Sequence, residues 1–336
     1  MPFRNNNTTA MMTTRQRFHE TMSYGKPDRV PYLEEGIRQD VLRAWYKQGL
    51  KRRTKISDLF TTDRFVEIDP DLDPFPEPTM WPETCPELED FKQRLDPDDQ
   101  RRWPDGWKKF IRESKKSDQL VFLRVHRGLF LSLGTGDWRR FERVMTIAAE
   151  NQSFVEHYMH IQSRFACLLM EKILKDLTVD AAIFSEPIGG NEGPLISPQM
   201  YESLVLSSYQ PLIRLLQQNG IRTIIFRTYA NVRIYIPSIL KFGINSLWAC
   251  ETNAEVMDYR QIRKEYGRDL RLIGGIDLDV LRAGKEAIKR EIMEKVPPLI
   301  AEGGYVPLAD GRVRSDIRFD NYYFYRKLLE DVTRPE

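Results

Sequence analysis

The stretch IIFRTYANVRIYIPSILKFGINSLW, residues 224–248, contains two short apolar runs separated by a segment of helical character. The runs at 223–226 and 246–249 have the length and the β-branched and aromatic content of buried strands. Between them, 232–242 carries apolar residues at helical spacing. A strand, a helix and a second strand in this order predict a βαβ unit, whose two strands lie parallel in one sheet.

The same alternation extends along most of the chain. Eight apolar runs are expected to be strands, and helix-length amphipathic segments separate them from the third run onward. The expected strands are 30–33, 65–68, 121–125, 181–184, 223–226, 246–249, 270–273 and 305–308, and the main helical segments are 146–177, 198–219, 232–242, 259–266 and 285–301. Eight strands with outer helices in a chain of 336 residues fit an α/β fold of the (β/α)8, or TIM barrel, type.

A doubly wound parallel sheet is the alternative fold. It normally carries a glycine-rich phosphate loop after its first strand, where this chain reads YLEEGIRQD with only Gly36. The GTG at 134–136 does not follow a strand in the way that a dinucleotide-binding turn requires. The barrel is therefore the predicted fold.

Two segments are expected to lie outside the regular barrel. Residues 1–12 are polar and predicted to be disordered, which leaves 13–336 as one barrel domain with a helix ahead of its first strand. Residues 70–118 are rich in proline, acidic residues and tryptophan and show no steady period. They predict either an ordered insertion that covers the mouth or builds an interface, or a surface loop packed by its own tryptophans.

Composition and charge argue against several classes of protein. The 51 basic and 49 acidic side chains lack the concentrated basic face of a nucleic-acid-binding protein. Cys85, Cys167 and Cys250 are far apart and match no metal spacing, and such sparse use of cysteine fits the reducing cytoplasm. No apolar run approaches the ~18 residues of a membrane span, and the N-terminus lacks the apolar core of a signal peptide. We expect a cytoplasmic protein without nucleic-acid or membrane partners.

Ionisable side chains stand at the ends of almost all the expected strands. Because the chemistry of a (β/α)8 barrel sits at the carboxyl ends of its strands, this ring favours a functional site. Glu186, beside the flexible Gly189-Gly190 pair, is the predicted general acid, and His126 is either a second acid/base or a structural hydrogen-bonding group. The others are Glu34, Glu35, Glu67, Asp69, Arg127, Arg227, Tyr229, Glu251, Asp277, Asp310, Arg312 and Arg314.

Four segments carry a resemblance to a known family. They are TTRQRFHETMSYGKPDRVPYLEE (13–35), GPLISPQMYESLVLSSY (193–209), EYGRDLRLIGGIDLDVLRAGKEAI (265–288) and KVPPLIAEGGYVPLAD (295–310). In this order they resemble the uroporphyrinogen decarboxylase superfamily, which also holds corrinoid-linked methyltransferases and related O-demethylases. The porphyrin decarboxylases carry an RQAGR-type segment after the first strand, where this chain reads EEGIRQD with Arg38 alone, so the resemblance favours the methyltransferase-like branch.

The chain departs from the family pattern at the fifth and eighth strands. Zinc methyltransferases of the family carry a His-x-Cys pair at the fifth strand, and O-demethylase-like members carry a DTDGN-like elbow. Here the elbow, 227–231, reads RTYAN, and the Asp-His of the eighth strand is replaced by Asp310-Gly311. A zinc site of the family type is therefore not expected, and no other metal ligands are assigned.

Arginine residues lie at or beside the positions where the family residues are missing, Arg227 in the elbow and Arg312 after Gly311. Arg227 is predicted to clamp an anionic group of the substrate, with Tyr229 stacking on that group or donating a hydrogen bond to it. The alternative is that Arg227 pairs with an internal acid such as Glu251 and supports the barrel. The predicted catalytic residues are Glu186, His126 and Tyr229, and the predicted substrate-binding residues are Arg227, Glu34, Asn231, Glu251, Asp310 and Arg312.

The resemblance implies a methyltransferase that moves a methyl group from a small carboxylated or aromatic substrate to a corrinoid on a separate carrier protein. This chain would then bind no cofactor directly. Cofactor-free decarboxylation is the second hypothesis, because arginines that hold carboxylates are its main tool. A ligand-binding barrel without catalysis is the third, motivated by the departures at 227 and 311. A homodimer is also implied by the resemblance.

Overall fold

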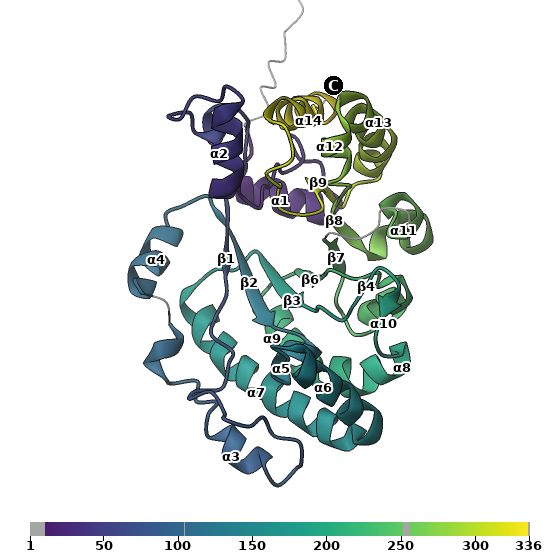
Figure 1. Cartoon of the computed structure of the whole chain (residues 1–336). Helices are drawn as coiled ribbons and strands as arrows, with labels where there is room; N and C mark the ends of the chain where they lie inside the picture. The colour runs from purple at the N-terminus through teal and green to yellow at the C-terminus, as the bar shows by residue number, and fades with distance from the viewer. Residues whose placement is uncertain (1–10, 104, 251–255, 335–336) are drawn as a thin grey trace, which may run out of the picture.

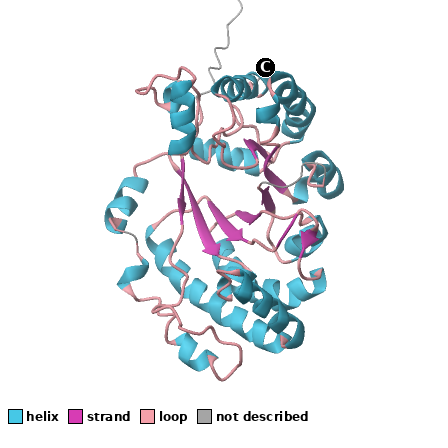
Figure 2. Ribbon diagram, viewed as in Figure 1, coloured by secondary structure: helices cyan, strands magenta, loops and turns pink. Residues whose placement is uncertain are grey.

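Seven parallel strands form one curled sheet in the residues that this computed structural model describes, 11–103, 105–250 and 256–334 (Figures 1 and 2). Their order is β1-β2-β3-β6-β7-β8-β9. The bounds are Phe65–Ile68 for β1, Leu120–His126 for β2, Ala181–Ser185 for β3, Thr223–Thr228 for β6, Ser246–Ala249 for β7, Arg271–Ile276 for β8 and Tyr305–Ala309 for β9. Two short strands, β4 (Gly189–Gly190) and β5 (Gly193–Pro194), form a separate antiparallel pair.

Helices surround this sheet (Figure 2). They are α1 Thr14–Met22, α2 Gln39–Lys47, α3 Leu88–Lys92, α4 Trp107–Ser114, α5 Leu129–Ser132, α6 Trp138–Glu150, α7 Gln152–Asp176, α8 Pro198–Tyr201, α9 Ser207–Gln218, α10 Ile236–Lys241, α11 Tyr259–Tyr266, α12 Val280–Ala283, α13 Lys285–Glu302 and α14 Phe319–Val332. A π-helix, Glu202–Leu206, joins α8 to α9, and 3-10 turns lie at Ile56–Asp58, Gln100–Arg102, Arg233–Tyr235 and Gly267–Asp269. In the described residues, no helix is both long and apolar enough to cross a membrane.

The opening βαβ prediction is confirmed. Strands β6 and β7 pair in parallel, with Ile225 opposite Ser246 and Arg227 opposite Trp248, and α10 connects them. The helix expected at 146–177 is two helices, because Asn151 leaves the helical conformation and caps α7. Its side-chain oxygen accepts a hydrogen bond from the N–H of Phe154 at 3.3 Å.

The expected first strand, 30–33, does not form, so the prediction of a closed eight-stranded barrel is wrong for the described residues. Pro31 has no N–H to donate to a strand ladder. The N–H of Tyr32 donates to the Asp63 carboxylate at 2.8 Å, and its carbonyl accepts from the Asp63 N–H at 2.9 Å. Leu33 is nevertheless buried in the same cluster as Val306 and Leu308 of β9. The segment fills part of the interior without completing the sheet.

The interior of the curled sheet contains an apolar layer below a charged one. Its buried apolar residues are Phe18, Met22, Leu33, Leu120, Phe122, Ala181, Ile183, Ile225, Trp248, Cys250, Ile273, Val306 and Leu308. Phe18 and Met22 belong to α1, which closes the amino end. Successive inward positions of a strand are two residues apart. Phe65, Phe122 and Ile225 are therefore followed on the same face by Glu67, Arg124 and Arg227.

The insertion at 70–118 is largely structured, with α3 and α4 in its middle (Figure 1). Trp103 and Trp107 stack at a centroid distance of 5.5 Å, and Phe91 packs on Tyr158 of α7 at 5.0 Å. The insertion is therefore packed both by its own tryptophans and against the outer helices. Of the segment predicted to be disordered, residues 1–10 lie outside the described part, and the N–H of Met12 donates to Asp28 at 2.9 Å.

Candidate functional site

A cavity of about 1000 Å³ lies at the carboxyl ends of the strands. Nine of the fifteen described residues that line it are charged, five of them arginines and four of them carboxylic acids. The lining residues are Glu34, Glu35, Gly36, Arg38, Phe65, Val66, Glu67, Asp69, Arg124, Arg227, Tyr229, Trp248, Gly311, Arg312 and Arg314. This location is the one that barrel enzymes use for their active sites, and the excess of arginine makes the cavity net positive.

Arg227 reaches across the interior to Glu67. Its two terminal nitrogens donate to the two carboxylate oxygens at 2.6 and 2.7 Å, although β6 and β1 are not neighbours in the sheet. Arg124 donates to Oε1 of the same carboxylate at 2.7 Å. Burial by itself would raise the pKa of Glu67, but hydrogen bonds and charge from Arg227 and Arg124 outweigh it and lower the pKa. Glu67 is therefore a fixed carboxylate, and it occupies the fork that was predicted to hold the substrate.

The alternative prediction for Arg227, pairing with an internal acid, describes this geometry better, with Glu67 as the partner. The side chain of Arg227 is only 9% exposed, and its Cζ lies 5.5 Å from the Trp248 ring centroid. Its Nε is buried and forms no hydrogen bond within the described residues. Arg227 thus gives the floor of the cavity a fixed positive charge, while the more accessible Arg312 lies at the rim.

Glu35 is a titratable carboxyl group of the cavity whose pKa is raised toward neutral pH. Burial, together with the negative charges of Glu34 and Glu67, raises its pKa to about 7, and the charges of Arg227 and Arg312 only partly oppose this shift. Its neighbour Glu34 accepts hydrogen bonds from Tyr322 at 2.5 Å and from Arg326 at 3.1 Å. The two adjacent carboxyl groups therefore differ. Glu34 is held by hydrogen bonds from Tyr322 and Arg326, whereas Glu35 can carry a proton near neutral pH.

Glu186 and His126, the predicted acids, lie together but do not line this cavity. Glu186 is fully buried, and its carboxyl accepts hydrogen bonds from the hydroxyls of Tyr201 and Tyr209, both at 3.0 Å. The N–H of Leu129 donates to its other oxygen at 2.8 Å. The Tyr209 hydroxyl also lies 3.1 Å from Nδ1 of His126. This placement gives neither group a direct path to a substrate in the cavity.

Burial moves the pKa of these two groups in opposite directions. It raises the pKa of Glu186 to about 7, partly opposed by the hydrogen bonds from Leu129, Tyr209 and Tyr201. It lowers the pKa of His126 to about 3, with the charge of Arg127 acting in the same direction. Near neutral pH the histidine is therefore an uncharged hydrogen-bonding group, which matches the structural alternative stated for it.

The remaining predicted residues divide between the cavity and its surroundings. Tyr229, which is 50% exposed, and Arg312 line the cavity, as does Glu34. Asp310 instead accepts the N–H of Leu278 at 2.9 Å; burial raises its pKa to about 7, and the charge of Asp277 adds to that rise.

Asn231 lines no part of the cavity, and Glu251 is not among the described residues. The Asn231 side chain accepts the N–H of Arg233 at 3.3 Å, so it stabilises the elbow after β6.

Five further residues line the cavity without a catalytic or binding role predicted from the sequence, although three of them were expected at strand ends: Glu35, Glu67 and Asp69, with Arg38 and Arg124. A signal for one of them exists in the sequence. Arg124 interrupts the apolar run LVFLRVH, where a charged residue is costly unless it is paired. Its partner could not be found from the sequence, because Glu67 lies in another strand, 57 residues earlier.

No cluster of three or more histidine, cysteine, aspartate or glutamate side chains suited to a metal ion occurs in the described part of the chain.

The sequence matches no protein-family model and no curated protein. Among solved structures, a methyltransferase from Methanosarcina mazei matches 95% of this chain and 99% of its own length, with a TM-score of 0.58 and 12% identity. At that identity the likeness shows the fold: a TIM-like arrangement of a curled parallel sheet and outer helices.

Proposed function

We propose that the chain is a methyltransferase that takes a methyl group from a small anionic substrate, methylated on oxygen, and passes it to a corrinoid on a separate carrier protein. The observation that carries this proposal is Glu35, a carboxyl group with a pKa of about 7 in a net-positive cavity. The shared fold with a methyltransferase and the resemblance of the four sequence segments support methyl transfer as the reaction class.

The lining of the cavity favours an anionic substrate. Five arginines face four carboxyl groups, one of which is Glu35, and Glu67 is already neutralised by two of the arginines. Arg312 is exposed and has no hydrogen bond or ion pair with the described residues. A guanidinium group of this kind can bind a carboxylate through two parallel hydrogen bonds. The volume, about 1000 Å³, is sufficient for a small aromatic acid.

Glu35 would supply the proton that the reaction needs. When the methyl carbon moves to the acceptor, the carbon–oxygen bond breaks and its electron pair stays on the substrate oxygen. Protonation of that oxygen by a carboxylic acid gives a neutral hydroxyl as the leaving group. The resulting Glu35 carboxylate lies in the field of Arg227 and Arg312, both of which favour its charged form. Solvent can then return the proton.

The corrinoid would supply the methyl acceptor. The cavity lining is mostly charged, with Phe65, Val66, Tyr229 and Trp248 as its larger apolar or aromatic members. Such a lining suits a small polar substrate better than a large macrocycle. The proposal therefore assigns substrate binding and proton transfer to this chain and corrinoid binding to the carrier.

The test is demethylation of methoxybenzoic acids with chemically reduced cobalamin as the acceptor, followed by chromatography of the hydroxybenzoic acid product. We expect turnover by the wild type and a fall in kcat of about 10²-fold in Glu35→Gln, which keeps the shape of the side chain but cannot protonate the oxygen. Wild-type activity should decline as the pH rises through about 7, and the variant should lose this decline. Glu171→Gln, an exposed position on α7, is the matched control and should keep full activity.

Other outcomes would redirect the assignment. Equal rates for Glu35→Gln and the wild type would exclude Glu35 as the acid. Release of carbon dioxide from carboxylated substrates without any methyl acceptor would favour a decarboxylase. A rise in Tm with these ligands, without turnover in either assay, would favour a ligand-binding barrel.

A further inference from the structure

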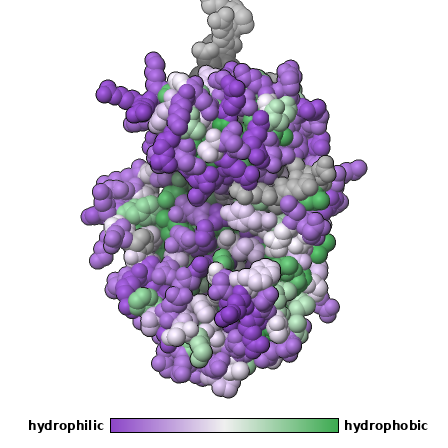
Figure 3. Space-filling model, viewed as in Figure 1, coloured by the Kyte–Doolittle hydropathy of each residue, from purple (hydrophilic) through white to green (hydrophobic). Residues whose placement is uncertain are grey.

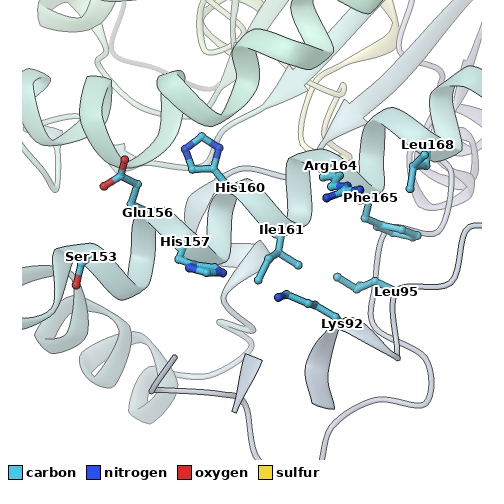
Figure 4. A pocket seen from close by; sticks show the side chains of 10 residues that line it. All are labelled: Lys92, Leu95, Ser153, Glu156, His157, His160, Ile161, Arg164, Phe165 and Leu168. Atoms are coloured by element: carbon cyan, nitrogen blue, oxygen red, sulfur yellow. The ribbon is translucent and has the colours of Figure 1, made fainter. Parts of the chain in front are cut away.

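A second hollow lies on the outer side of α7, facing α3 of the insertion (Figure 4). Its volume is about 630 Å³, and no described residue lines both this groove and the cavity of the proposed site. We refer to it as the α3–α7 groove. Its lining residues are Lys92, Leu95, Ser153, Glu156, His157, His160, Ile161, Arg164, Phe165 and Leu168.

The two sides of the groove are fixed relative to each other. Besides the packing of Phe91 on Tyr158, the guanidinium carbon of Arg102 lies 4.5 Å from the ring centroid of Phe165. Arg102 is itself buried, where it donates to the carbonyl oxygens of the insertion. Since these contacts join the insertion to α7, the packing of the fold fixes the two walls of the groove.

The α7 side of the groove presents a basic row beside an apolar row. His157, His160 and Arg164 follow one another at spacings of three and four residues, which places them along one face of the helix. Ile161, Phe165 and Leu168 form the apolar row at the same spacings, and Leu168 is 41% exposed. Figure 4 shows Ile161 on the side of α7 that faces Lys92 and Leu95.

The basic side chains of this face are available to a partner. His157, His160 and Arg164 are exposed and have no hydrogen bond or ion pair with the residues that the structure describes. Lys92 is paired with Glu89 at 2.6 Å, but both side chains are exposed, so the pair is weak and exchangeable. Glu156 is the one acidic residue among the described lining residues. With Lys92 and Arg164 against Glu156, the described lining carries a small excess of positive charge.

We infer that the α3–α7 groove docks an acidic amphipathic helix of a partner protein. From Ser153 to Leu168 the groove follows α7 for about 22 Å, the length of about four helical turns. A helix with leucines on one face and glutamates beside them would cover the apolar row and pair with the basic row. The basic side chains of the groove favour an acidic partner, and the exposed Leu168 favours one with an apolar face.

The position of the groove relates it to the mouth of the barrel. Helix α7 follows β2 and must run back along the sheet before β3 begins, so its first half lies near the carboxyl ends of the strands. A helix in the groove would lie on the flank of the barrel near the end that holds the cavity. The inference does not depend on methyl transfer, since it uses none of the residues of the proposed site.

The test is a fluorescence anisotropy titration of the full chain into a labelled helical peptide of about 15 residues, with leucine at positions i, i+3, i+4 and i+7 and glutamate beside them. We expect saturable binding to the wild type and binding about tenfold weaker to Arg164→Glu. Lys175→Glu makes the same charge change at an exposed position of α7 outside the groove and should bind like the wild type. Circular dichroism melting should show that both variants are folded.

Two control peptides separate amphipathic docking from general attraction. A scrambled peptide of the same composition and a peptide with lysine in place of glutamate should each bind at least about tenfold more weakly. Equal loss of binding in Arg164→Glu and Lys175→Glu, equal binding of the scrambled peptide, or no binding at all would overturn the inference. A change in oligomeric state caused by Arg164→Glu alone would also overturn it, because the occupant would then be a second copy of the chain.

Discussion

Three inward-facing residues determine the charge of the cavity floor. Glu67, Arg124 and Arg227 occupy the layer directly above the apolar interior, and the glutamate accepts hydrogen bonds from both arginines. A buried charge is stable only when it is paired and hydrogen-bonded, so each member of this group depends on the others. The pairing also joins β1 to β6 across a sheet that does not close in the described residues.

Removing Glu67 should therefore be more harmful than removing a neighbouring carboxylate. We expect Glu67→Ala to lower the free energy of unfolding by about 3 kcal/mol, because it leaves Arg227 buried without its acidic partner. Asp69→Ala, at a position 49% exposed whose ion pair among the described residues is with Arg124, should lower it by less than about 1 kcal/mol. Urea denaturation at neutral pH gives both values. Equal losses for the two variants would show that the cross-barrel pair has no special role.

At the scale of elements, the π-helix at Glu202–Leu206 determines the surroundings of Glu186. In a regular α-helix, two residues eight positions apart differ by about 80° in direction. A π-turn contains more residues and so rotates less per residue, which brings Tyr201 and Tyr209 toward the same side. Both hydroxyls lie 3.0 Å from one oxygen of Glu186. On the opposite side Gly128, with φ of 83°, leaves room for this carboxyl, since a Cβ there would lie 2.3 Å from Oε1.

The two tyrosines should differ in their contribution to stability. The Tyr209 hydroxyl contacts both Glu186 and His126, whereas the Tyr201 hydroxyl bonds to Glu186. We expect Tyr209→Phe to lower the free energy of unfolding by about 2 kcal/mol and Tyr201→Phe by about 1 kcal/mol, since the former removes contacts with two buried groups and the latter a contact with one. Chemical denaturation of the two variants side by side measures the difference. A larger loss in Tyr201→Phe would contradict this account of the cluster.

For the whole molecule, buried acids make stability depend on pH. Glu186 has an ordinary pKa of 4.5 and a pKa of about 7 in the folded chain. Between these values the unfolded chain ionises this group more readily, so its contribution to stability falls as the pH rises from about 4.5 to about 7. His126 acts in the opposite direction, because its pKa falls from 6.5 to about 3 on folding. The pH dependence of the free energy of unfolding is the sum of these contributions, so variants of single residues are needed to separate them.

Glu186→Gln should gain stability relative to the wild type as the pH rises through this range. The difference in free energy of unfolding between the variant and the wild type should change by on the order of 3 kcal/mol, because the pKa of Glu186 differs by about two and a half units between the folded and unfolded chain.

Glu67→Gln should show the opposite trend, because the pKa of Glu67 is lowered in the folded chain. This variant should be least stable relative to the wild type at neutral pH and should approach the wild type below about pH 4. Denaturation curves from about pH 2 to 8 test both trends. A pH-independent difference for Glu186→Gln would mean that this carboxyl ionises normally in the folded chain.

The sequence by itself determined the strands whose apolar runs are long enough to be recognised locally. All seven strands of the main sheet in the described residues lie within three residues of their expected bounds, because each is a run of largely buried side chains flanked by turns. The βαβ unit of 224–248 followed from the same local pattern. The positions of Arg227 and Arg312 in the cavity at the carboxyl ends of the strands also followed, since the ends of β6 and β9 can be read from the sequence, whereas Glu34 lines the cavity although the strand expected before it does not form.

Only the tertiary structure decided which side chains share a space. Glu186 follows β3 directly, yet it is enclosed by tyrosines from the next helical segment instead of facing the cavity. The pKa of Glu35 is raised to about 7 because burial and two other carboxylates act on it together. Periodicity gives the face of a strand but not the partner across the interior, so the pairing of Arg227 with Glu67, 160 residues apart, could come only from the fold. The same reason explains 30–33, where the contact with Asp63 replaced a strand that the apolar run had predicted.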